Sequence, residues 1–155
     1  MMERSTPPPL DVPVLEDGEQ VSRVDLVFYG VDHSGPSYEA HVFIDQPDAD
    51  LDTPLDQEHG YAGSFTVFGH DGCYGDEGHC LPDQRYTDEF DQRPPHPLQP
   101  WTKTVIAGHA LVRAVEDPEV SQVSLTVVAD VLTDESSSGK PAASYDSVRL
   151  LVYAD

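Results

Sequence analysis

Hydrophobic and polar residues alternate with a period of two along six stretches of the chain, a spacing typical of half-buried β-strands. In the first stretch, for example, Val24, Leu26 and Phe28 share one face. The six stretches cover residues 21–29, 38–45, 61–68, 101–106, 123–129 and 148–154. Because helices do not alternate with these strands, the pattern predicts an all-β fold, an antiparallel β-sandwich of the jelly-roll type or a partial barrel.

The period changes to that of a helix at one place only. Over residues 107–115, apolar residues such as Ala107 and Leu111 recur at helical spacing for about two turns, and Pro118 then prevents continuation. The sequence therefore predicts one short helix between the fourth and fifth strands.

In the third predicted strand, residues 61–68, alternation places Tyr61 and Phe65 on the same face.

Two segments lack such periodicity. Residues 1–20 combine four prolines with acidic residues, and this composition predicts a disordered or loosely attached tail in front of a single β-sandwich domain at residues 21–155. Residues 69–100 carry five prolines, four glycines, both cysteines and three histidines. A loop of this length is usually functional, cross-linked or disordered, so we expect any chemistry of the chain to lie there.

The charge balance of the chain argues against some classes of binding partner, namely those that are themselves polyanionic. The chain has 29 acidic and 8 basic residues, a formal net charge of −21, and the basic residues are scattered singly. Nucleic acids and anionic membrane surfaces are therefore not expected as partners, because both require a basic face. We expect a cytoplasmic protein, since no apolar run has the length of a membrane helix and no signal peptide is visible.

A glycine-rich stretch within the long loop concentrates nitrogen and sulfur donors. His70, Cys73, His79 and Cys80 could converge on one tetrahedral zinc or copper(I) ion. Alternatively, Cys73 and Cys80 form a disulfide or remain structural thiols. A third hypothesis is a small thiol-dependent enzyme in which one of these cysteines pairs with His70 or His79, although no third, orienting group is recognisable.

The remaining candidates for chemistry have plainer interpretations. His33, His41, His59, His96 and His109 are interpreted as surface or capping residues, and Trp101 as a residue that anchors the core. Phosphate-binding glycine loops, dinucleotide-binding motifs and the HExxH zinc motif do not occur in the sequence. We therefore expect no catalytic residues in this chain, and no cofactor beyond the copper or zinc considered above.

Two adjacent predicted strands suggest a relative. The stretch Tyr38 to Asp45, the acidic connector after it and Tyr61-Ala62-Gly63-Ser64-Phe65 resemble the C-terminal β-sandwich domain of tyrosinases and polyphenol oxidases. The resemblance continues through residues 102–105, the helical stretch and residues 123–128, and spans residues 21–130. In full-length oxidases of that family, this domain packs over a separate catalytic domain with two copper ions.

The resemblance implies a non-catalytic role. A type-3 copper site needs six histidines, several of them closely spaced on helices, whereas consecutive histidines here are at least 8 residues apart. The family's copper ligands therefore match no position of this chain. We expect an accessory subunit or chaperone-like partner of a separately encoded tyrosinase-like copper oxidase, with a metal-binding protein or a small thiol-dependent enzyme as the alternatives.

Overall fold

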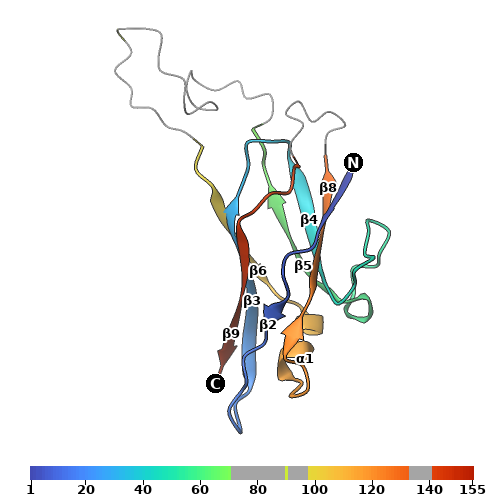
Figure 1. Cartoon of the computed structure of the whole chain (residues 1–155), viewed down its shortest axis with the longest axis vertical. Helices are drawn as coiled ribbons and strands as arrows, with labels where there is room; N and C mark the ends of the chain where they lie inside the picture. Colours follow the sequence, from blue (N-terminus) through green and yellow to red (C-terminus); the bar gives the residue numbers. More distant parts are fainter. Residues whose placement is uncertain (71–89, 91–97, 133–140) are drawn as a thin grey trace.

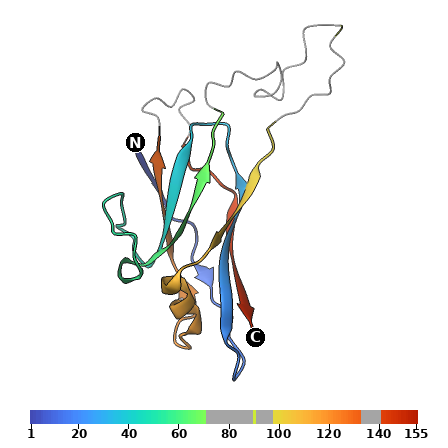
Figure 2. The ribbon, with the colours of Figure 1, turned by 180° about the vertical axis from the view of Figure 1, so that it is seen from behind.

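The computed structural model describes residues 1–70, 90, 98–132 and 141–155, in which the strands form two principal antiparallel sheets (Figures 1 and 2). The four-stranded sheet has the order β1-β8-β4-β5, and the three-stranded sheet the order β6-β3-β9. A short two-stranded sheet joins β2 to β7. The strands are β1 (Met2–Ser5), β2 (Leu10–Asp11), β3 (Val21–Val31), β4 (Tyr38–Ile44), β5 (Tyr61–Val67), β6 (Trp101–Ile106), β7 (Gln122–Val123), β8 (Leu125–Val131) and β9 (Ser147–Ala154). The predicted all-β, sandwich-like fold with a short helix is confirmed.

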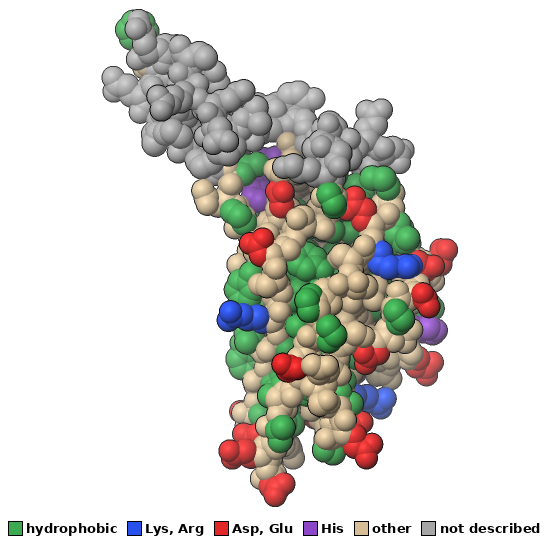
Figure 3. Space-filling model, viewed as in Figure 1, with side chains coloured by type: hydrophobic (Ala, Val, Ile, Leu, Met, Phe, Trp, Pro, Cys, Tyr) green, Lys and Arg blue, Asp and Glu red, His purple; other side chains and the backbone are tan. Residues whose placement is uncertain are grey.

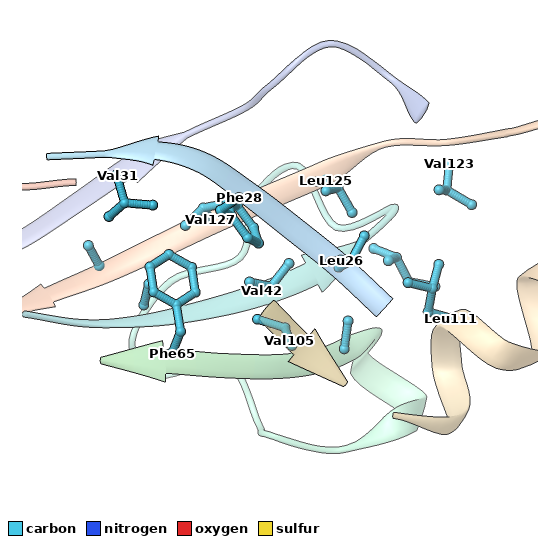
Figure 4. Packing of buried hydrophobic residues seen from close by; sticks show 14 of the residues in the cluster. Leu26, Phe28, Val31, Val42, Phe65, Val105, Leu111, Val123, Leu125 and Val127 are labelled. Atoms are coloured by element: carbon cyan, nitrogen blue, oxygen red, sulfur yellow. The ribbon is translucent and has the colours of Figure 1, made fainter. Parts of the chain in front are cut away.

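The core lies between the inner faces of these two sheets. Val24, Leu26 and Phe28 of β3 are fully buried, as their alternation predicts, and they pack toward Val42 of β4 and Val127 of β8 (Figure 4). Residues paired across antiparallel strands point to the same face, so the register places Val105 of β6 beside Leu26 on this inner side. The period-two pattern therefore identifies the core correctly.

A bulge in β5 corrects one detail of the prediction. Val42 pairs with Gly63 but the next residue, Phe43, pairs with Tyr61, which leaves Ala62 as an extra residue. This insertion turns Tyr61 to the outer face, where its ring packs on that of Phe43 with centroids 5.7 Å apart. The prediction that Tyr61 shares a face with Phe65 was therefore wrong.

The helix α1 (His109–Glu116) closes one end of the sandwich. Its buried residues Ala110, Leu111 and Val115 point into the core, and the helix ends one residue before Asp117. In front of it, the Gly108 N–H donates to the Ala62 carbonyl at 2.8 Å and so connects the end of β6 to β5. Among the described residues, no helix has the length and apolar character needed to cross a membrane.

The N-terminal segment differs from the predicted tail. Residues Met2–Ser5 form β1 and pair with β8, and the Val12 N–H donates to the Ser121 carbonyl at 2.9 Å. The Glu3 carboxylate accepts the main-chain N–H groups of Ala142 and Ala143 at 2.7 and 3.1 Å. Polar backbone and carboxylate contacts, which leave no apolar pattern in the sequence, hold this segment in place.

Tyr38 carries a hydroxyl group for which the structure provides no hydrogen-bond partner among the described residues. Its side chain is fully buried at the start of β4, and burial raises the pKa of its hydroxyl. An unfolded tyrosine ionises near pH 10 whereas folded Tyr38 keeps its proton, so rising pH favours the unfolded chain. Above about pH 10, each further pH unit should therefore lower the free energy of unfolding by about 1.4 kcal/mol because of this residue.

We expect Tyr38→Phe to reduce the alkaline loss of stability, while at neutral pH the variant is as stable as the parent or more stable. Part of the loss should remain, because burial also raises the pKa of Tyr145. Urea unfolding at pH 8, 10 and 11 measures both effects. Tyr153→Phe is the matched control, because that side chain is 45% exposed, and it should retain the pH dependence of the parent. Equal alkaline slopes for parent and Tyr38→Phe would contradict the assignment.

Candidate functional site

The loop between β3 and β4 brings His33 to the residues that follow β5. The His70 main-chain N–H donates to the His33 carbonyl at 2.9 Å, and the Gly69 N–H donates to the Ser37 hydroxyl at the same distance. These bonds fix His70 beside His33, at the end of the sandwich opposite α1, where histidine side chains are visible in Figure 3. We call the two imidazoles the histidine pair.

Gly69 makes this close approach sterically feasible. A Cβ atom at this position would lie 2.0 Å from the Gly35 carbonyl oxygen and 2.4 Å from the carbonyl carbon of Pro36. Both neighbours are backbone atoms, which cannot move aside as the end of a side chain can. Only glycine therefore fits between the β3–β4 loop and His70.

Packing holds the His33 ring in place. His33 is only 4% exposed, and its ring stacks on Trp101 of β6 with centroids 3.9 Å apart and planes inclined by 18°. Trp101 pairs with Val31 at the end of β3, which places the indole next to the loop that carries His33. The Lys103 ammonium group lies 4.7 Å from the centroid of the Trp101 ring. Strands β3 and β6 thus build a rigid aromatic support for His33.

Hydrogen bonding determines which nitrogen of His33 carries the proton. Its Nε2 lies 2.6 Å from the Gln99 carbonyl oxygen, which can only accept, so Nε2 must donate. In the neutral imidazole, Nδ1 is then the acceptor nitrogen. This Nδ1 lies 3.2 Å from the Nδ1 of His70, which is also 3.2 Å from the His33 carbonyl oxygen. The two Nδ1 atoms therefore face each other in a partly buried position.

The predicted metal ligands are only partly covered by the structure. His70 lies in the histidine pair, whereas Cys73, His79 and Cys80 lie outside the described residues, as does the predicted Cys73–Cys80 disulfide. Within the described parts of the chain, no group of three or more histidine, cysteine, aspartate and glutamate residues could hold a metal ion. The four-ligand site therefore stays a prediction.

His33 is the site residue that the sequence interpretation missed. The sequence predicts a surface or capping residue at this position, but His33 is buried and bonded through both ring nitrogens. His59 does lie on the surface and bonds to Asp56 at 2.7 Å, and this bond lowers the pKa of the Asp56 carboxyl group. His109 is exposed at the first position of α1. Alternation from Phe28 places His33 on the outer face, and the register shift between Phe28 and Val31, which turns this end of β3 inward, leaves no signal in the sequence.

The outer faces of the two sheets differ in how they are covered. On the four-stranded sheet, Phe43 and Val128 are buried together with Ala49 from the β4–β5 connector. On the three-stranded sheet, Ile106 and Leu151 flank Asp25 in register and are 65% and 38% exposed. The second face thus leaves large apolar side chains in contact with solvent.

Two arginines accompany these apolar residues. The Arg23 guanidinium lies 4.9 Å from the centroid of the Tyr153 ring, and that of Arg149 lies 5.5 Å from the Tyr29 ring. Arg23 also forms an ion pair with the buried Asp25 carboxylate, and this hydrogen bond raises the pKa of Arg23. We call this surface the outer sheet face; its residues are Arg23, Asp25, Val27, Tyr29, Thr104, Ile106, Arg149, Leu151 and Tyr153.

On the face shown in Figure 3, the positive side chains of the described residues lie apart from one another, among several acidic ones. Two of the 8 basic residues of the whole sequence, Arg23 and Arg149, lie on the outer sheet face, which also exposes aromatic and aliphatic side chains.

Comparisons with protein-family models, curated proteins and solved structures found no match to this chain. The resemblance to the tyrosinase C-terminal domain accordingly stays a prediction.

Proposed function

We propose that this chain is a non-catalytic accessory partner of a tyrosinase-like type-3 copper oxidase. The stretches that carry the resemblance, 38–45 and 61–65, form the adjacent strands β4 and β5. The later stretches supply β6 and β8 of the same sandwich, so the resembling residues together make up most of its core. This arrangement supports a role as a domain that packs against a separate catalytic protein.

The outer sheet face is the observation that carries the proposal. Protein interfaces are enriched in aromatic residues and arginine and depleted in lysine, glutamate and aspartate at their centres. The outer sheet face exposes Ile106, Leu151 and Tyr153 beside two arginines that lie near tyrosine rings. Its one aspartate, Asp25, is buried and paired with Arg23. On a chain with a net charge of −21, the two arginines reduce the charge repulsion that an acidic partner surface would meet at this face.

We expect the double variant Ile106→Asp, Leu151→Asp to bind a type-3 copper oxidase from the same source at least tenfold more weakly than the parent. Two added carboxylates would have to be desolvated at the interface. Co-purification and titration calorimetry measure binding, and the oxidase's copper content and activity show its effect. Because both side chains are exposed, the variant should fold as the parent does.

Phe68→Asp provides the matched control, since Phe68 is 72% exposed and follows β5 on the other sheet. This variant should bind as the parent does. If the parent neither binds the oxidase nor changes its copper content or activity, the accessory role is wrong. If Phe68→Asp weakens binding and the double variant does not, the outer sheet face is not the contact surface.

A second candidate function is metal binding, with zinc or copper(I) as the ion. It is favoured by one observation, namely that the main-chain N–H of His70, the first of the predicted ligands, bonds to His33 and so holds His70 next to the buried His33 imidazole. A metal-binding accessory protein could also supply copper to the oxidase. Elemental analysis of the protein purified without chelator tests this function independently of any partner.

A further inference from the structure

We propose that His33 and His70 bind one zinc or copper(I) ion through their two Nδ1 atoms. His33 is then a metal ligand in addition to the predicted ligand His70, and binding of the ion needs no oxidase partner. These two nitrogens are the only ligands assigned, and water or other donor atoms fill the remaining coordination positions.

The distance between the two nitrogens suits one shared ion. Zinc binds imidazole nitrogen at about 2.0–2.1 Å, and two such nitrogens around a tetrahedral ion lie about 3.3 Å apart. The Nδ1 atoms of His33 and His70 are 3.2 Å apart. The spacing of the histidine pair therefore matches one shared ion, and each ring has to turn so that its Nδ1 lone pair points to the ion instead of to the other ring.

The surroundings of His33 match those of a metal-binding imidazole. Histidines that bind metals almost always donate their second ring N–H to a carbonyl or carboxylate, which fixes the tautomer and the ring orientation. His33 donates Nε2–H to the Gln99 carbonyl at 2.6 Å, and Trp101 stacks on the same ring. The lone pair of Nδ1 is thereby directed at His70 before any ion binds.

Metal binding requires one proton to move. In the metal-free protein, the Nδ1 of neutral His33 is an acceptor, so the proton between the rings belongs to Nδ1 of His70. The ion takes the place of this proton, and His70 changes to its Nε2–H tautomer. No redox step is needed, and the net charge of −21 concentrates cations near the protein.

The experiment uses the only tryptophan of the sequence as its reporter. Because Trp101 stacks on His33, its fluorescence should change as Zn²⁺ is added to the full chain, with an end point of one ion per chain. Competition with a chromophoric chelator gives the affinity for Zn²⁺ and, under anaerobic conditions, for Cu(I). We expect His33→Phe and His70→Phe each to lower this affinity at least tenfold, since phenylalanine keeps the ring but removes both nitrogens.

His109→Gln is the matched control, because this histidine is exposed on α1, and the variant should bind as the parent does. The proposal is overturned if His33→Phe binds the ion as tightly as the parent. It is also overturned if Cys73→Ser abolishes binding while both phenylalanine variants retain it, because the loop alone would then hold the ion.

A second measurement avoids variants that fail to fold. In long-range ¹H–¹⁵N spectra of the parent protein, Zn²⁺ should shift the Nδ1 resonances of His33 and His70 and change the tautomer of His70. Unchanged Nδ1 resonances at saturating Zn²⁺ would falsify the proposal. Neither measurement includes an oxidase. Both therefore test metal binding even if the chain is not an accessory partner of an oxidase.

Discussion

Replacing Phe28 with alanine is expected to lower the free energy of unfolding by about 3–5 kcal/mol, the usual cost of deleting a buried aromatic ring. Phe28 is fully buried at the centre of β3. Its ring packs on Phe65 of β5 with centroids 4.8 Å apart and receives the edge of Tyr145 at 5.2 Å. The substitution would leave a cavity at the place where both sheets and the segment before β9 meet (Figure 4).

Urea unfolding followed by far-ultraviolet circular dichroism measures this loss. Phe68→Ala is the control, because Phe68 is 72% exposed, and its cost should stay within about 0.5 kcal/mol. A loss below about 1 kcal/mol for Phe28→Ala would show that the sheets do not pack around this ring as described.

Gly69→Ala is expected to have the second largest effect, a loss of about 1–3 kcal/mol typical of overpacking. The added methyl group would collide with the main chain of Gly35 and Pro36, so the β3–β4 loop and the chain after β5 must move apart. His70 would then lose its main-chain bond to His33, and the histidine pair would separate. We therefore expect weakened zinc binding together with lower stability.

Gly35→Ala is the matched control for this variant. It lies in the same loop, yet a Cβ atom there would meet no heavy atom within 4 Å, so both stability and zinc affinity should stay near those of the parent. The two variants are compared by urea unfolding and by the chelator competition described above. Equal behaviour of the two would contradict the close approach at Gly69.

The sequence predicts the central strands well because their alternation reports directly on burial. It fails where the structure depends on backbone geometry, as at Ala62 and Gly63, where one inserted residue reverses the face of Tyr61. It also fails for β1, whose residues show no apolar alternation because their place is fixed by pairing with β8 and by the contacts of Glu3. Neither bulges nor polar edge strands leave a periodic signal.

The candidate site is predictable only in part for the same reason. His70 is found because it stands in a stretch dense in nitrogen and sulfur donors. His33 lies 37 residues earlier, and its role follows from the contact between two loops and from the carbonyl of Gln99. Such a contact depends on the topology of the sheets, which the order of hydrophobic residues does not specify. The outer sheet face likewise requires the strand register.

The two sides of the sandwich are connected in different ways. On one side, the main-chain bond from Gly108 to Ala62 connects β6 to β5. On the other side, the bridges use side chains, namely the Ser5 hydroxyl with the Tyr145 hydroxyl at 2.8 Å and the Glu3 carboxylate with residues 142–143. Side-chain bridges can exchange for water without breaking a strand ladder. We therefore expect local opening to begin at these side-chain bridges, before the main-chain bond from Gly108 to Ala62 is broken.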